Sequence, residues 1–271
     1  MKKLFCLIAL VLAFSTGLTS ADAAAVKVAA HEVEYADGDL KMKGFLAYPE
    51  IRKQTKLPAV LVVHEWWGHN EYARTRAKQL AKLGYVALAV DMFGEGKQAA
   101  HPDDAKKFAA EATKNFDVAS ARFLAALDFV RQQPQVDAGR IAAIGYCFGG
   151  GVVLNMARQG ADLRGVASFH GSLAPAKPAE KGAVKARIIV FNGADDVMIK
   201  PEQIEAFKQE MTDAGADFTF INYPRTKHSF TNPEADRYAK EFNMDIAYNK
   251  SADQKSWYEL RRFLKSVFSS K

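Results

Sequence analysis

One stretch constrains the fold of this chain more than any other. Residues 141–151 read IAAIGYCFGGG, so an apolar run typical of a strand leads without a spacer into the start of a helix. Gly145 and Gly149 stand two residues before and two residues after Cys147. A residue at such a corner is held in a strained backbone conformation, and its crowded neighbours leave room only for glycine. The stretch therefore predicts a nucleophile elbow, which lifts the Cys147 side chain above a sheet and beside a helix N-terminus that favours a thiolate.

A glycine-rich phosphate loop is the alternative interpretation of the same residues. Such loops carry a lysine that contacts the phosphates, or the glycine spacing of dinucleotide-binding folds. The sequence around Cys147 has neither feature, which favours the elbow.

The rest of the chain alternates between buried-strand patterns and helical patterns. This alternation predicts an α/β fold, in which a mostly parallel twisted sheet is covered by helices on both faces. An N-terminal antiparallel hairpin is expected around Asp37-Gly38-Asp39. Strands are expected at 26–35, 41–48, 58–64, 85–90, 140–146, 165–169, 186–191 and 218–223, and helices at 72–83, 103–131 (in two pieces), 148–158, 201–214 and 252–268. No repeat or long linker divides residues 26–271, so we expect one domain with its ligand site beyond the carboxyl ends of the strands.

The first 23 residues have the pattern of a secretory signal peptide. Lys2 and Lys3 precede an apolar run, and Ala21-Asp22-Ala23 fits a cleavage site. We therefore expect an exported protein, located in the periplasm, with no stable membrane anchor after cleavage. Cys6 would leave with the signal, so the mature chain would keep Cys147 alone and could form no internal disulfide.

A thiol nucleophile needs a base and a group that orients the base. In hydrolases with a nucleophile elbow the chain order is nucleophile, acid, histidine. His228 follows the last expected strand, which is the place of the catalytic histidine. Asp195 and Asp196 both follow the preceding strand. Either could orient His228, and the pattern G-x-x-D followed by an apolar residue favours Asp196.

Other candidate site residues follow strands at the same expected edge of the sheet. The backbone N–H groups of Trp66 and Phe148 occupy the positions of an oxyanion hole. Trp67 and His170 are candidates for contact with the substrate. The alternatives are packing for one of the two tryptophans and a structural role for His170. No set of residues has the spacing of a metal or cofactor site, so none is expected.

Five motifs together resemble the dienelactone hydrolase family of the α/β-hydrolase superfamily. They are H-E-x-x-G at Glu65, Asp91-Met92-Phe93-Gly94, G-Y-C-x-G-G at Cys147, G-x-x-D at Asp196 and H-x-F at His228. The resemblance covers residues 33–268. It implies the α/β-hydrolase fold, hydrolase activity on ester bonds, and a part for Glu65 in activating the cysteine. The family's best-known members hold a substrate carboxylate with arginines, one of them shortly after H-x-F, where this chain has Thr231-Asn232-Pro233.

These residues predict hydrolysis of a small-molecule ester, lactone or related acyl bond through a Cys-His-Asp triad and an acyl-enzyme. A non-catalytic binding protein on the same fold is one alternative, but all three triad positions are filled. A redox-sensing thiol protein is another, although it would normally need a resolving cysteine. The net charge of +6 is spread without a long basic run, which gives no support for a nucleic-acid partner. No obligate protein partner is evident.

Overall fold

The computed structural model describes residues 26–50 and 55–269. The expected signal peptide lies outside these residues, and export stays a prediction. Across the described part of the chain, no helix has the length and apolar character needed to cross a membrane.

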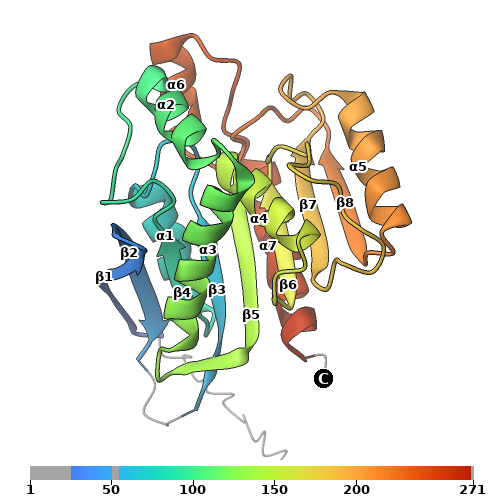
Figure 1. Ribbon diagram of the computed structural model, residues 1–271. Helices are drawn as coiled ribbons and strands as arrows, with labels where there is room; N and C mark the ends of the chain where they lie inside the picture. Colours follow the sequence, from blue (N-terminus) through green and yellow to red (C-terminus); the bar gives the residue numbers. More distant parts are fainter. Residues whose placement is uncertain (1–25, 51–54, 270–271) are drawn as a thin grey trace, which may run out of the picture.

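Eight strands form one sheet in the order β1-β2-β4-β3-β5-β6-β7-β8 (Figure 1). From β4 to β8 along this order, each strand runs parallel to its neighbour. The strands are β1 (Val28–Asp37), β2 (Leu40–Pro49), β3 (Leu57–Val63), β4 (Val86–Val90), β5 (Val136–Tyr146), β6 (Gly165–Phe169), β7 (Arg187–Gly193) and β8 (Phe218–Tyr223). β1 and β2 form the expected hairpin, and β2 adds antiparallel to β4. The predicted mostly parallel sheet with an N-terminal hairpin is confirmed.

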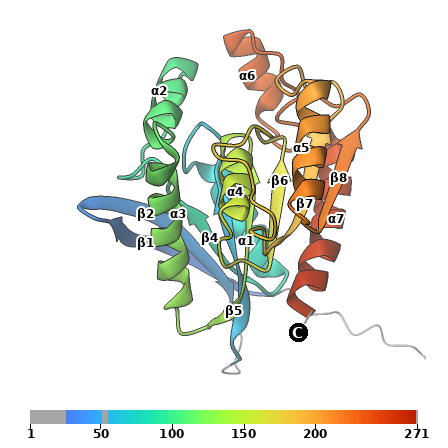
Figure 2. The ribbon, with the colours of Figure 1, turned by 45° about the vertical axis from the view of Figure 1, so that its right-hand side comes forward.

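Helices cover both faces of this sheet (Figures 1 and 2). They are α1 (Glu71–Lys82), α2 (Pro102–Ala112), α3 (Phe116–Arg131), α4 (Phe148–Arg158), α5 (Pro201–Asp213), α6 (Ala235–Phe242) and α7 (Lys250–Ser269). Successive side chains of β3 point to opposite faces of the sheet, as the pleat of a strand requires. Val60 and Val62 belong to the core beneath α1 and α7, whereas Leu61 and Val63 belong to the core beneath α3, α4 and α5.

Local sequence signals set where several helices begin. The side chain of Asn70 accepts a hydrogen bond from the Tyr72 N–H at 3.2 Å, which caps α1. Asn115 caps α3 in the same way by accepting from the Val118 N–H at 3.0 Å. Each cap satisfies an N–H group that has no partner within the helix. The cap at Asn115 also separates α2 from α3, as the sequence predicts.

α6 is the one helix in the described residues that the sequence analysis did not predict. It lies with α2 at the top of Figure 1, at the end of the sheet where the parallel strands finish. Its Tyr238 ring stacks on Trp67 at a centroid distance of 4.3 Å, and Phe242 meets the His101 ring at 5.3 Å. Ala235 alone among its residues is buried. Contacts with distant loops therefore hold this helix in place. Its own sequence carries a short apolar stripe, with Ala235, Tyr238, Ala239 and Phe242 at positions i, i+3, i+4 and i+7.

Candidate active site

Cys147 occupies the corner between β5 and α4. Its φ of 51° and ψ of −114° lie in a region that side-chain-bearing residues rarely adopt. Its backbone N–H donates to the Phe169 carbonyl at 3.0 Å, which ties the corner to the adjacent strand. The side chain is partly exposed. The expected elbow is therefore present, and its strained residue is the cysteine.

The glycines around Cys147 are required by close backbone contacts. A Cβ atom on Gly145 would lie 2.1 Å from the Gly149 carbonyl oxygen. A Cβ atom on Gly149 would lie 2.4 Å from the Val63 carbonyl oxygen. The N–H of Gly149 also donates to the His64 carbonyl at 3.1 Å. The start of α4 is thus pressed directly against the end of β3.

His228 lies in the loop after β8 and is oriented by Asp196 from the loop after β7. The two are joined by a 2.7 Å contact between His228 Nδ1 and Asp196 Oδ2, and both side chains are buried. Asp196 Oδ1 accepts from the Met198 N–H at 2.9 Å, which fixes the carboxylate. Asp195 is exposed, so of the two aspartates only Asp196 contacts the histidine.

The other ring nitrogen of His228, Nε2, is buried and makes no well-aligned hydrogen bond. His228 and Cys147 line the same cavity. Burial lowers the pKa of His228, but the neighbouring Cys147 sulfur and the Asp196 carboxylate outweigh this effect and raise the pKa to about 10. The arrangement therefore favours a protonated His228 ring beside Cys147.

The loop after β3 places a fixed peptide unit at the same site. His64 Nε2 accepts from the Met92 N–H at 3.2 Å, so the ring proton lies on Nδ1 and is donated to the Glu65 carbonyl at 2.5 Å. Burial lowers the pKa of His64 and thus favours this neutral ring. The Gly68 N–H donates to the same carbonyl at 3.1 Å. Because the N–H of a trans peptide points away from its C=O, the two bonds also set the direction of the Trp66 N–H.

Glu65 itself is buried behind this loop. Its Oε2 accepts from Asn232 Nδ2 at 2.5 Å, and its Oε1 has no partner. Burial raises the pKa of Glu65, while Asn232 and the nearby positive charge of His228 act in the opposite direction. Burial therefore favours a neutral carboxyl group next to the histidine.

A cavity of about 280 Å³ opens over Cys147 and His228. Its walls include Trp66, Phe148 and Ser229. A larger hollow of about 760 Å³ lies beside α5 and touches Asp196, but neither Cys147 nor His228 lines it. Within residues 26–50 and 55–269, no group of three or more His, Cys, Asp or Glu side chains is placed to hold a metal ion.

Comparison with known proteins assigns the family. Residues 42–268 match the Dienelactone hydrolase family. The chain belongs to this family. A solved structure titled m3DLH is 36% identical, has a TM-score of 0.84 and aligns 89% of this chain with 99% of its own. A dienelactone hydrolase-like promiscuous phosphotriesterase, P91, from metagenomic libraries is 32% identical, with the same TM-score and the same coverage of both chains.

Curated relatives agree with this assignment. One from Escherichia coli strain K12, whose name includes carboxymethylenebutenolidase, is 28% identical over 207 residues, which is 72% of this chain and 74% of the relative. As a member of the dienelactone hydrolase family, the protein is a hydrolase that acts on ester or lactone bonds.

In this dienelactone hydrolase, the fold brings most of the expected site residues together. Trp66, Cys147, Phe148 and His228 line the cavity. Asp196 contacts His228 directly, and Glu65 lies behind the histidine loop.

Trp67 and His170 are placed differently from the expectation that they contact substrate. Trp67 is 2% exposed and packs against α6, and His170 is fully buried. Neither lines the cavity. The neighbouring Trp66 takes the position at the cavity wall that the sequence analysis gave to Trp67.

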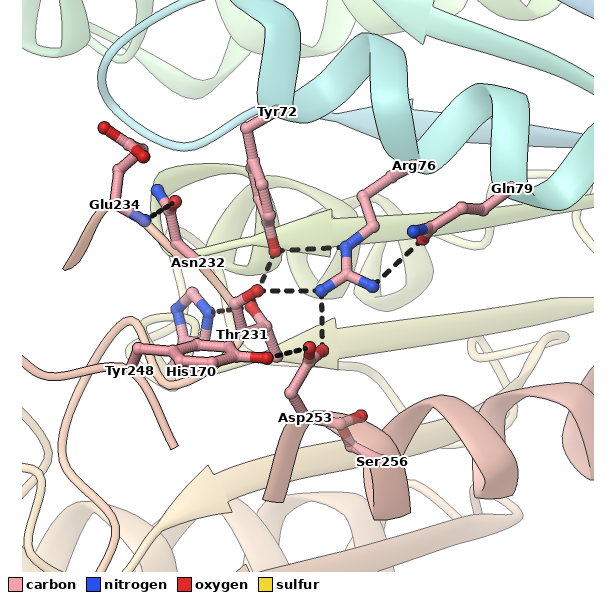
Figure 3. A network of polar contacts seen from close by, with 10 residues as sticks. All are labelled: Tyr72, Arg76, Gln79, His170, Thr231, Asn232, Glu234, Tyr248, Asp253 and Ser256. Atoms are coloured by element: carbon pink, nitrogen blue, oxygen red, sulfur yellow. Dashed lines mark hydrogen bonds and ion pairs between the residues drawn. The ribbon is translucent and has the colours of Figure 1, made fainter. Parts of the chain in front are cut away.

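His170 instead belongs to a buried polar network in this dienelactone hydrolase (Figure 3). Its Nε2 lies 2.9 Å from the Thr231 hydroxyl, which also contacts the Tyr72 hydroxyl at 2.7 Å. Its ring meets the His228 ring edge-on at 4.9 Å. Burial lowers the pKa of His170 well below its usual value, so the ring is neutral. His170 therefore supports the histidine loop from behind.

Arg76 connects the same network to two helices. From α1, its guanidinium donates to the Thr231 carbonyl at 2.8 Å and to Asp253 of α7 at 2.6 Å (Figure 3). The Tyr248 hydroxyl donates to the other Asp253 oxygen at 3.1 Å. The sequence alone assigns no such contacts to Arg76, Thr231 or Asn232. The available signal was the one-turn spacing of Tyr72 and Arg76, which places both on one face of a helix.

Proposed function

We propose that this hydrolase cleaves its substrate through a Cys147-His228-Asp196 triad and an acyl-enzyme intermediate. The observation that carries the proposal is the 2.7 Å contact of His228 Nδ1 with Asp196, which leaves Nε2 without a partner beside Cys147. This is the geometric relation of base and orienter that nucleophilic catalysis requires.

In the first step the Cys147 thiolate attacks the carbonyl carbon of an ester or lactone. A carbon–sulfur bond forms, and the negative charge moves to the carbonyl oxygen. The Trp66 and Phe148 N–H groups are the proposed donors to that oxyanion. The Phe148 N–H lies in the first turn of α4, where N–H groups have no intrahelical acceptor.

Collapse of the tetrahedral intermediate then releases the alcohol. The imidazolium of His228 donates its Nε2 proton to the leaving alkoxide, and the carbon–oxygen bond breaks. The now neutral imidazole accepts a proton from water as the water oxygen attacks the thioester carbonyl carbon. The resulting tetrahedral intermediate collapses, the carbon–sulfur bond breaks and the acid leaves, which restores the Cys147 thiolate beside the His228 imidazolium. Asp196 stabilises the imidazolium in both halves of the reaction.

Glu65 is proposed to assist this cycle as an uncharged neighbour. A neutral carboxyl group does not compete with the thiolate for the positive charge of His228. The Asn232 amide holds one of its oxygens in place.

Mass spectrometry of the protein during turnover tests the proposal. With p-nitrophenyl acetate we expect one acetyl group on the Cys147 peptide, and we expect it to accumulate when His228→Gln slows attack by water. Lys227→Gln is the matched control, because this neighbouring side chain is half exposed and pairs with Asp245. A hydrolase that turns over the ester with no adduct at Cys147, or with an adduct on another residue, would contradict the proposed triad.

The proposed oxyanion hole predicts different effects for two substitutions of His64. His64→Gln keeps an acceptor near the Met92 N–H but loses the donor to the Glu65 carbonyl. We expect kcat to fall about 10- to 100-fold with little change in KM, because the Trp66 N–H is no longer held toward the oxyanion. His64→Asn places an N–H near the position of Nδ1 and should retain more activity. Steady-state kinetics of both variants, at temperatures equally far below their Tm values, make the comparison. Equal losses in kcat for the two variants would show that His64 acts only through packing.

A further inference from the structure

The walls of the cavity above Cys147 are strongly apolar. They come from segments that are far apart in the sequence but finish at the same end of the sheet. Besides Trp66, the apolar side chains on these walls are Ala109 of α2, Phe148 of α4, Met198 and Ile199 after β7, and Met244 and Ile246 after α6. The two serines, Ser172 and Ser229, are the polar side chains outside the reacting pair.

Among the described residues that line this cavity, Cys147 and His228 are the only ones with an ionisable side chain. Basic side chains do occur nearby in the sequence. Lys106 and Lys107 of α2 and Lys200 before α5 are exposed, and none of the three is part of the cavity wall. The Arg122 guanidinium donates to the Met92 carbonyl at 2.8 Å. Arg76 is held by Thr231 and Asp253.

A substrate carboxylate bound here would therefore lose its hydration shell without forming an ion pair with a basic side chain. Burying an unpaired charge in apolar surroundings is strongly unfavourable. The proposed thiolate of Cys147 would add repulsion, because like charges in a poorly solvated site interact strongly. His228 is the cation within reach, and the Asp196 carboxylate at 2.7 Å already neutralises it.

We infer that this site takes uncharged esters, with an apolar acyl or alcohol group against the Met198, Ile199, Met244 and Ile246 side chains. The inference rests on the proposed function and names its substrate class. The cavity volume of about 280 Å³ is just below the range of about 300–1,000 Å³ common for sites of drug-sized ligands. The substrate is therefore a small ester.

Two esters that differ in a single end group test the inference. They are p-nitrophenyl hexanoate and the mono-p-nitrophenyl ester of adipic acid, which have the same carbon count and leaving group. The second ends in a carboxylate where the first ends in a methyl group. We expect kcat/KM, divided by the spontaneous rate of each ester in the same buffer, to be at least about 100-fold higher for the hexanoate. Physiological salt in the assay limits effects of distant surface charges.

A pair of arginine variants locates the cause of the preference. Met198→Arg brings a guanidinium to the cavity wall at a side chain that is 47% exposed and so tolerates the change. In this variant the ratio of kcat/KM for the hexanoate to kcat/KM for the adipate ester should fall at least about tenfold, mainly because kcat/KM for the adipate ester rises. Val197→Arg adds the same charge one residue away, at a side chain that is 64% exposed and outside this cavity. It should leave the preference unchanged.

The outcomes separate the inference from the proposed function. Equal or faster hydrolysis of the adipate ester would overturn the inference and leave the hydrolase mechanism intact. If Val197→Arg and Met198→Arg narrow the preference equally, the selectivity does not arise from the cavity wall, and the inference also fails. Turnover of both esters no faster than by Cys147→Ala protein would refute the proposed function and the inference together.

Discussion

Replacing Cys147 by alanine is expected to lower kcat for ester hydrolysis by about 10⁴-fold or more, because no acyl-enzyme can form. Some rate above that in water would remain, since the oxyanion donors and the cavity stay in place. Cys147→Ser keeps a nucleophilic atom but not one that ionises readily, so we expect its kcat to be at least about tenfold below that of the native protein. Steady-state assays with p-nitrophenyl acetate measure both effects.

The control for these variants is thermal stability. Cys147 is partly exposed and both replacements are small, so Tm should change by no more than about 2 °C. An alanine variant that folds normally and keeps more than a tenth of the native kcat would exclude Cys147 as the nucleophile.

Asp196→Asn is expected to lower kcat about 10⁴-fold, a loss comparable to that for alanine at Cys147. An asparagine fits the same space but offers His228 an amide, which favours the wrong ring tautomer and no longer stabilises the imidazolium. Because Asp196 is one of the groups that raise the pKa of His228 to about 10, this pKa should also fall in the variant. The His228 imidazolium would then lose its proton at lower pH than in the native protein. NMR titration of the histidine rings, with His228→Gln to assign the signal, measures that shift.

The adjacent residue provides a matched control. Asp195→Asn makes the same chemical change at an exposed side chain, so we expect kcat within about twofold of the native value. If Asp195→Asn proves the more damaging of the two substitutions, the orienting carboxylate has been assigned to the wrong aspartate.

The elbow could be predicted from sequence because its requirements lie within a few consecutive residues. The close backbone contacts at the elbow can be inferred from the glycines on either side of Cys147. Any side chain at Gly145 or Gly149 would overlap a carbonyl oxygen. The parallel strands were equally clear, because strands buried on both faces are continuous apolar runs. The order of acid and histidine along the chain then followed from the order of the strands that carry them.

The cavity walls could not be predicted in the same way. Met198 and Ile246 lie in loops, where no periodic pattern shows which side chain points inward. Trp66 and Trp67 are consecutive, and the sequence could not show that Trp66 lines the cavity while Trp67 is stacked on α6. The place of Trp67 depends on α6 itself, which is short and held by distant contacts. His170 was correctly expected near the site, but only the fold shows that its ring lies behind His228.

The ion pair between Arg76 and Asp253 determines at which stage of folding the active site is complete. Thr231 and the histidine loop are anchored to α1 through Arg76, and Arg76 is in turn neutralised by α7. α7 follows all eight strands along the chain. A newly made polypeptide that has already assembled its sheet thus still leaves Arg76 without its carboxylate partner, and the histidine loop gains its full support only when the final helix docks.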